Sequence, residues 1–177
     1  MYVDSGFGMD PDKRRSRYGY LILLNANPIA FGTGLTQKTA TSTPEAEYIA
    51  MAHGLRELLW TYQILQTIGL DVETPIRVME DNQACIHIAE NPVSQKRTRQ
   101  IDIKYHFIRD YIDDGTISVK YCPTKDMLAD ILTKAMPRPA FQGLRSRIIG
   151  DVVSFLGSDE LLVSAHYCRT IYHSMIR

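Results

Sequence analysis

Apolar and polar positions at the start of the chain follow the patterns of β-strands. Residues 19–24 form a run of strand-forming apolar residues, residues 25–28 carry turn-forming Asn and Pro, and residues 29–35 have the composition of a returning strand. A short apolar pair at positions 2–3 precedes them. The pattern predicts three strands, with residues 10–17 in the loop between the first two.

A long helix follows, and several signals mark its limits. Ser42 is a capping hydroxyl residue, Pro44 stands at an early helical position, and Glu45 completes a capping box. The helical pattern continues to about Ile68, and Gly69 is a typical helix stop. The sequence therefore predicts one long helix between these signals.

The rest of the chain alternates strands with helices. The predicted elements are a strand at 76–80, helices at 82–90 and 101–113, a strand at 116–122 and a helix from 123 to 134. The whole order is three strands, a helix, a strand, two helices, a strand and a helix. This order predicts an α/β fold with a mixed sheet.

Four acidic residues fall where such a sheet would gather them. Asp4 follows the short first strand, and Asp81 follows the strand at 76–80. Glu47 lies in the first turns of the long helix, and Asp130 lies inside the last predicted helix. We therefore expect these four carboxylates to be candidates for one shared site.

Helix geometry separates Glu47 from its neighbour Glu45. At about 100° per residue, Glu45 shares a stripe with Arg56 and Gln63, which indicates a position facing solvent. Glu47 falls on the opposite, apolar face, in line with Leu58. A carboxylate on an apolar face is unfavourable unless a positive group meets it, so Glu47 is the better candidate.

Converging carboxylates require a counter-charge. At ~4 Å, each like-charged pair costs about 4 kcal/mol at an effective dielectric constant of about 20. Oxygen ligands without His or Cys favour Mg²⁺ or Mn²⁺, and two such ions ~3.5–4 Å apart serve phosphodiester hydrolysis. Acids at the ends of strands and helices are also ordinary caps or solvated residues, and spacing alone leaves both interpretations open.

Composition narrows the class of protein. The 177 residues are 45% hydrophobic and 23% charged, which is typical of a globular protein with its own core. No apolar run approaches the ~20 residues of a membrane span, and no signal peptide is visible, so a cytoplasmic or nuclear location follows by default. The three cysteines lie far apart without a CxxC pair, which favours reduced thiols over disulfides or a zinc site.

The charge distribution bears on nucleic-acid binding. The net charge is zero, with 20 basic and 20 acidic residues, which argues against binding by bulk charge alone. Basic residues nevertheless form two clusters, the first within residues 13–17. The second cluster consists of Lys96, Arg97, Arg99, Lys104 and Arg109. Each cluster is either part of a solvated loop or a surface for phosphates.

Six ordered motifs give the chain a family resemblance. It resembles the ribonuclease H region of copia-type retrotransposon polyproteins over about residues 2–149. The matching runs are YVD at 2–4, RSRYGY at 15–20, STPEAEY at 42–48, EDNQ at 80–83, IDIKYHF at 101–107 and ADILTK at 129–134. Their order and spacing match as well, and a closing PRPxFxxL pattern follows at 137–144.

The resemblance implies a ribonuclease H-like fold, a five-stranded mixed sheet flanked by helices. It implies endonucleolytic hydrolysis of the RNA strand of RNA/DNA hybrids during retrotransposon reverse transcription, with two Mg²⁺ or Mn²⁺ ions. By motif match, the catalytic and metal-binding acids fall on Asp4, Glu47, Asp81 and Asp130; the helical-face argument independently selects Glu47. The implied partners are the hybrid and the reverse transcriptase domain of the same polyprotein, in a virus-like particle of the cytoplasm or in the nucleus.

Other residues of the matched runs receive further roles. His106 is a candidate for proton transfer or for orienting the substrate, although a buried histidine at a helix interface is the plainer interpretation. Asn82 and Gln83 are candidates for substrate contact, and Asn82 is equally a candidate helix cap. The candidates for binding the nucleic-acid backbone are Lys96, Arg97, Arg99 and Lys104.

The chain departs from the family pattern at its start. Three residues precede Asp4, so we expect a short first strand that anchors Asp4 poorly, as in a fragment of a polyprotein. We expect a ribonuclease H-like domain at 1–135, the family's helical extension at 136–150 and an unassigned tail at 151–177. Truncation favours an alternative function, a silent remnant that only binds hybrid or docks to a polymerase. Another nuclease or an integrase with the same sheet fits the motifs poorly.

Overall fold

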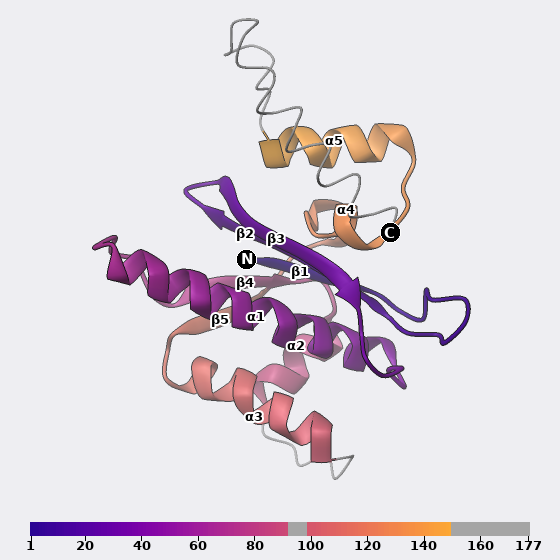
Figure 1. The fold of residues 1–177 in the computed structure, drawn as a ribbon, viewed down its shortest axis with the longest axis horizontal. Coiled ribbons are helices and arrows are strands. Elements are labelled where there is room, and N and C mark those ends of the chain that lie inside the picture. Colours follow the sequence, from indigo (N-terminus) through magenta and orange to yellow (C-terminus); the bar gives the residue numbers. More distant parts are fainter. Residues whose placement is uncertain (92–98, 150–177) are drawn as a thin grey trace, which may run out of the picture.

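The computed structural model describes residues 1–91 and 99–149, with side chains described throughout these ranges except at positions 99–105. Its strands are β1 (Tyr2–Gly6), β2 (Arg17–Leu24), β3 (Asn27–Leu35), β4 (Ile76–Glu80) and β5 (Ile117–Tyr121). Its helices are α1 (Thr43–Thr67), α2 (Gln83–Glu90), α3 (Arg99–Asp113), the 3-10 helix η1 (Thr124–Asp126), α4 (Asp130–Thr133) and α5 (Arg138–Ile149). Figure 1 shows these helices arranged around one central sheet.

The strands form a mixed sheet in the order β3-β2-β1-β4-β5. The neighbours β1, β2 and β3 run antiparallel, whereas β4 is parallel to both β1 and β5. The predicted five-stranded mixed sheet is therefore confirmed. Because β1 and β4 run in the same direction, their carboxyl ends lie at one end of the sheet. Asp4 and Asp81 are at that end.

The first strand is longer and better anchored than the sequence predicted. β1 pairs with β2 along all five of its residues, and Asp4 stands opposite Gly19. The amino group of Met1 donates a hydrogen bond of 2.8 Å to the carbonyl oxygen of Arg77, which fixes the start of the strand to β4. The expectation of a poorly anchored Asp4 was wrong. Strand pairing needs backbone groups and not apolar side chains, so Ser5 and Gly6 extend the ladder.

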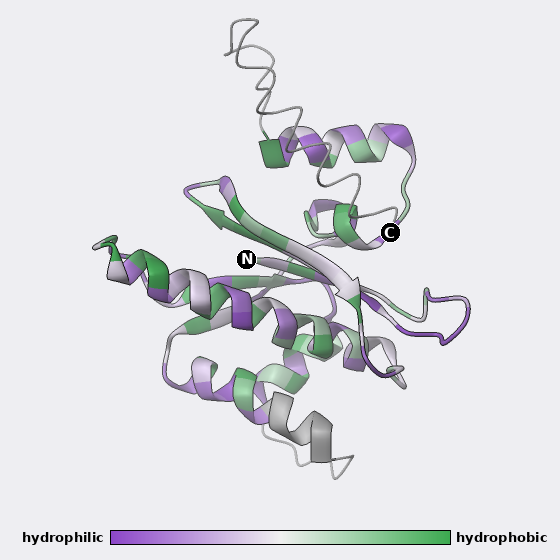
Figure 2. Cartoon of the chain, in the orientation of Figure 1, coloured by the Kyte–Doolittle hydropathy of each residue, from purple (hydrophilic) through white to green (hydrophobic). Residues whose placement is uncertain are grey.

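Helices cover both faces of the sheet. α1, α2 and α3 pack on one face, and α4 and α5 pack on the other (Figure 1). The larger core lies under α1, where Met51 and Leu55 meet Val3 of β1. A second apolar cluster lies under α4 and α5 and includes Leu132 and Leu144. The mixture of apolar and polar residues around α1 in Figure 2 matches a helix with one buried face.

The start of α1 follows the predicted signals. Ser42 is the N-cap, and its hydroxyl oxygen accepts a hydrogen bond of 3.4 Å from the backbone N–H of Glu45. The Glu45 carboxylate in turn accepts a bond of 2.7 Å from the N–H of Thr41. Glu45 is thus occupied by helix capping. The helix ends at Thr67, close to the predicted stop at Gly69.

The predicted helix from 123 to 134 was wrong in its middle. The chain forms η1, then an extended residue at Met127, then the single turn of α4. This break allows Met127 and Leu128, both buried, to enter two different apolar clusters. The burial of both side chains outweighs a continuous helix. Asp130 is consequently the first residue of α4 and does not lie inside a longer helix.

The helix α5 falls within the predicted extension at 136–150. It packs on the sheet beside β3 through buried Leu144 and Ile148. Residues 151–177, the predicted unassigned tail, lie outside the described residues. None of the described helices is long and apolar enough to cross a membrane.

Candidate metal centre

Glu47 is a buried acid on α1. Its side chain is 4% exposed, and its Oε2 atom has no hydrogen-bond partner among the described residues. The apolar face of α1 carries this residue to the sheet, as the helical-face argument predicted. An ionised carboxylate in this position is unfavourable without a positive partner. The Glu47 carboxylate therefore requires either a proton or a bound cation at this position.

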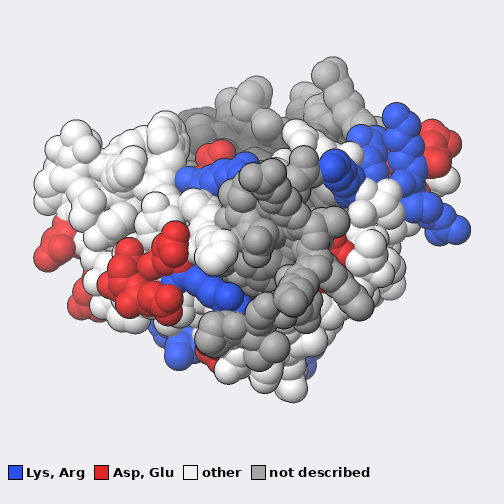
Figure 3. Space-filling view, turned by 90° about the horizontal axis from the view of Figure 1, so that it is seen from below, with Lys and Arg blue, Asp and Glu red and all other residues white. Residues whose placement is uncertain are grey.

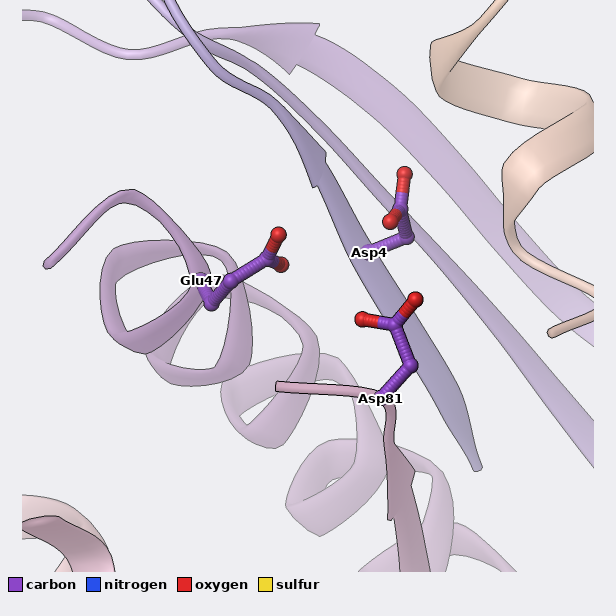
Figure 4. A group of neighbouring side chains, drawn as sticks. All are labelled: Asp4, Glu47 and Asp81. Atoms are coloured by element: carbon purple, nitrogen blue, oxygen red, sulfur yellow. The ribbon is translucent and has the colours of Figure 1, made fainter. Parts of the chain in front are cut away.

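Three carboxylates converge at this point of the fold. Asp4, Glu47 and Asp81 each offer an oxygen, and these oxygens all lie within 4.8 Å of one another. Figure 4 shows the three side chains pointing toward a common point from β1, from α1 and from the residue after β4. Thr124 donates a hydrogen bond of 2.8 Å to Oδ2 of Asp81 and so orients this half-buried acid.

Asp130, the fourth predicted acid, is tied to the cluster through a lysine. The Lys134 ammonium donates bonds of 3.0 Å to Oδ1 of Asp4 and 2.7 Å to Oδ1 of Asp130. The hydroxyl of Thr133 donates a short bond to the other oxygen of Asp4. Asp130 is buried at 9% exposure, but it is outside the group of three acids that meet within 4.8 Å. The structure therefore brings three acids together, and the Lys134 ammonium, which is paired with both Asp4 and Asp130, links the fourth acid to them.

Burial and the charges of neighbouring acids raise the pKa values of two of these acids, Glu47 and Asp130. Burial, followed by the charges of Glu80, Asp4 and Asp81, raises the pKa of Glu47 to about 10. Burial raises the pKa of Asp130 to about 6, although its bond with Lys134 acts in the opposite direction. Burial lowers the pKa of Lys134, but its bond to Asp130 and the charge of Asp4 outweigh burial and raise it above its usual value. Such perturbed groups are typical of functional sites.

Glu80 is a fifth acid, which the sequence reasoning missed. It is fully buried at the end of β4; one oxygen accepts a bond of 3.0 Å from the N–H of Asn82. Its Oε2 atom has no partner among the described residues. Burial raises the pKa of Glu80 to about 8. The signal was present in the strand alternation, because Glu80 shares the inward face of β4 with Val78.

The other predicted site residues have varied positions. Asn82 caps α2, since its side chain accepts a bond of 3.1 Å from the N–H of Cys85, and Gln83 is exposed in the first turn. His106 is exposed on α3 and not buried at a helix interface. Lys96 and Arg97 lie outside the described residues. Arg99 and Lys104 belong to α3, but their side chains are outside what is described.

Arg109 differs from the other members of its basic cluster. This half-buried residue donates one bond of 3.1 Å to the carbonyl oxygen of Ile88 and a second, short bond to that of Asn91. It thereby ties α3 to the end of α2. These contacts favour a structural role for Arg109 over the predicted role in binding phosphates.

The donor set fits a hard divalent cation. Asp4, Glu47 and Asp81 present oxygen ligands only, and such ligands favour Mg²⁺ or Mn²⁺. The Glu47 side chain points toward the other two acids (Figure 4), and its buried Oε2 atom has no hydrogen-bond partner among the described residues. A bound cation would remove the repulsion that raises the pKa of Glu47.

The five-stranded mixed sheet with helices on both faces is that of a ribonuclease H fold. The structure matches LC11-RNase H1, isolated from compost by a metagenomic approach, with a TM-score of 0.54 and 18% identity, over 82% of this chain and 96% of that one. LC11-RNase H1 in complex with an RNA/DNA hybrid gives a TM-score of 0.53 and 18% identity, over 75% of this chain and 91% of that one. The predicted ribonuclease H-like fold is confirmed.

By sequence, the chain is a homologue of Pol polyproteins from copia-type plant transposons. It is 36% identical over 141 residues to the retrovirus-related Pol polyprotein from transposon TNT 1-94 of Nicotiana tabacum. The aligned region covers 80% of this chain and 10% of that polyprotein. It is 34% identical over 147 residues to that from transposon RE1 of Arabidopsis thaliana, over 83% of this chain and 10% of the relative. The chain thus spans about a tenth of these relatives. No protein-family model matches it.

Proposed function

We propose that this chain is a metal-dependent endonuclease that hydrolyses the RNA strand of RNA/DNA hybrids during retrotransposon reverse transcription. The observation that carries the proposal is the convergence of Asp4, Glu47 and Asp81 within 4.8 Å, in a ribonuclease H fold and in a homologue of Pol polyproteins. The buried oxygen of Glu47 without a partner supports a cation at this point. Most buried carboxylate oxygens have a donor, so an oxygen without one favours a cation over a purely structural cluster.

The proposed ligands are Asp4, Glu47 and Asp81, with Asp130 as the fourth acid of the site. Two Mg²⁺ or Mn²⁺ ions held by these residues would supply activation of water and stabilisation of charge on the phosphodiester. The chain's own contribution is to hold the acids in place before the substrate arrives. Thr124 donates a hydrogen bond to Asp81, and hydrogen bonds of this kind hold the ligands of other metal sites in their orientation.

Substrate contacts would come from groups around this end of the sheet. The loop between β1 and β2 follows the end of β1, and its Lys13 and Arg14 are exposed. Figure 3, which looks at the side on which α3 lies, shows basic side chains with a few acidic ones among them at one end, and mostly acidic side chains with basic ones beside them at the other. The basic end is the one where this loop projects in Figure 1. Positive groups there suit the phosphates of a hybrid.

The remaining predicted contacts are part of the same proposal. Gln83 is exposed in the first turn of α2, two residues after Asp81. It suits a contact with the minor groove, where 2′-hydroxyls distinguish RNA from DNA. His106 is exposed and suits proton transfer or substrate orientation. The proposed partner is the reverse transcriptase domain of the same polyprotein. The proposed location is the cytoplasm or the nucleus.

A silent remnant was the alternative, and it depended on a truncated first strand. β1 pairs with β2 over five residues and places Asp4 at 1% exposure with bonds from Thr133 and Lys134. The feature that favoured the alternative is therefore absent from the described fold. The convergence of Asp4, Glu47 and Asp81 within 4.8 Å also supports an active site over a silent remnant.

The test is cleavage of a hybrid whose RNA strand is labelled at its 5′ end, in Mg²⁺ and separately in Mn²⁺. We expect cutting of the RNA strand in the hybrid and none of duplex DNA or single-stranded RNA. Asp81→Asn should lower the rate at least about 100-fold, because loss of a ligand costs no less than loss of a group behind it. Asp126→Asn is the matched control, since Asp126 is paired with Arg147 on the surface. Equal rates for Asp81→Asn and the native chain would refute the proposal.

A further inference from the structure

The acidic site has two parts, which differ in whether a positive side chain is already bonded to the carboxylates. The carboxylates of Asp4, Glu47 and Asp81 meet without a basic side chain bonded to Glu47 among the described residues, and Oε2 of Glu47 has no partner. The pair formed by Asp4 and Asp130 is different, because the Lys134 ammonium lies between them at 3.0 and 2.7 Å. One half of the site thus needs a cation, and the other half already has one.

We propose that the Lys134 ammonium fills the second cation position of this site, between Asp4 and Asp130. The chain alone then holds one divalent ion, at Asp4, Glu47 and Asp81, and accepts a second ion only when the ammonium leaves. This inference deepens the proposed function and rests on it. Lys134 is here a positioning residue that acts through the two carboxylates it bonds.

The local structure makes this arrangement specific. α4 is one turn long, and Lys134 directly follows it, four residues after Asp130. Thr133 bonds the second oxygen of Asp4, so consecutive residues hold both oxygens of that acid. Gly19, opposite Asp4, lets α4 approach closely: a Cβ there would lie 2.8 Å from Cβ of Leu132 and from Cγ2 of Thr133. The close packing keeps the ammonium at the acids.

The Lys134 side chain is also able to leave. It is 36% exposed, whereas the acids that it bonds are buried, so the long aliphatic stem gives the ammonium a route to solvent. A second divalent ion, or a phosphate of the substrate, would compete for the ammonium's two contacts. Movement of the Lys134 side chain alone would therefore allow a divalent ion to replace the ammonium between Asp4 and Asp130.

The experiment is titration calorimetry with Mn²⁺ alone, using the full chain and reading the number of ions bound. We expect one ion for the native chain, two for Lys134→Met and one for Lys134→Arg, which restores the charge. The second ion should bind at least about tenfold more tightly to Lys134→Met than to the native chain, because no ammonium repels it. Lys120→Met, which removes an exposed charge from β5, is the matched control and should bind one ion.

Two ions of similar affinity in the native chain, or a single ion in Lys134→Met, would overturn the inference while leaving the proposed nuclease intact. No Mn²⁺ binding by the native chain would instead overturn the proposed function. If circular dichroism shows that Lys134→Met does not fold, the Mn²⁺ affinities of Asp130→Asn and Asp81→Asn test the inference instead. We expect Asp130→Asn to keep the affinity for the single ion within about threefold and Asp81→Asn to weaken it at least about tenfold. Equal losses would overturn the inference.

Discussion

Glu47→Gln should make the metal-free protein more stable at alkaline pH, although it removes a proposed ligand. Glutamine has nearly the shape of glutamate but no charge. In the native chain, the Glu47 pKa is raised to about 10 by burial and by three neighbouring acids. Folding at pH 8 therefore requires either a proton that the unfolded chain has released or a fourth negative charge in the cluster.

The sign and size follow from this pKa. A carboxyl whose folded pKa is raised contributes stability that is complete below its ordinary pKa, near 4.5, and that is lost as pH rises toward 10. Roughly 3.5 pH units separate 4.5 from pH 8, at about 1.4 kcal/mol each, which gives an upper limit of about 5 kcal/mol. Glu80 and Asp81 share the same repulsion, so we expect Glu47→Gln to gain about 2 kcal/mol at pH 8 and almost nothing at pH 5.

The assay is thermal unfolding followed by circular dichroism in EDTA, at steps between pH 5 and pH 9. For a protein of this size, about 2 kcal/mol corresponds to a rise in Tm of roughly 4–8 °C. Glu45→Gln is the control on the same helix, because Glu45 caps the helix and lies outside the cluster. Added Mg²⁺ should reverse the order by stabilising only the native chain. Parallel pH profiles for the native chain and Glu47→Gln would refute the reasoning.

Three further substitutions test other parts of the account. Gly19→Ala should push α4 away from the sheet, because a Cβ there lies 2.8 Å from Leu132 and Thr133; we expect a loss of about 1–3 kcal/mol in urea unfolding, and an unchanged free energy of unfolding would contradict the close approach of α4. Arg109→Met leaves two carbonyl groups without their donor and should cost about 1–3 kcal/mol in urea unfolding, while the salt dependence of hybrid binding stays the same; a shallower salt dependence would restore Arg109 to the phosphate surface. Met51→Ala, at a fully buried position, should cost about 2–5 kcal/mol in the same assay, and a loss below 1 kcal/mol would argue against the core under α1.

Much of the fold was predictable from local patterns. The capping signals at Ser42 and Glu45 correctly located the start of α1. Their side chains accept hydrogen bonds from backbone N–H groups that have no partner inside the helix, which favours a helix start at this position. The break at Met127 was not predictable in the same way. Its cause is tertiary, since two apolar clusters formed by distant segments receive Met127 and Leu128. The length of β1 also depended on its partner β2 and not on its own residues.

The candidate site was predictable in its acids but not in its internal bonds. Periodicity placed Glu47 on the buried face of α1, and the structure agrees. The role of Lys134 could not be predicted, because its position relative to Asp4 depends on the docking of α4 against β1, 130 residues apart in sequence. Glu80 was not predicted as part of the site, because Asp81 after the strand already supplied the expected acid, although the strand alternation indicated that Glu80 is buried.

The central claim is that β1, α1 and the end of β4 deliver three carboxylates to one divalent cation. Anomalous diffraction at the manganese edge, from crystals of the native chain grown with Mn²⁺, tests it most directly. The account predicts an anomalous peak within ligand distance of Asp4, Glu47 and Asp81, at about 2.0–2.4 Å from their oxygens. A fully occupied Mn²⁺ peak elsewhere with none between these three side chains would contradict it.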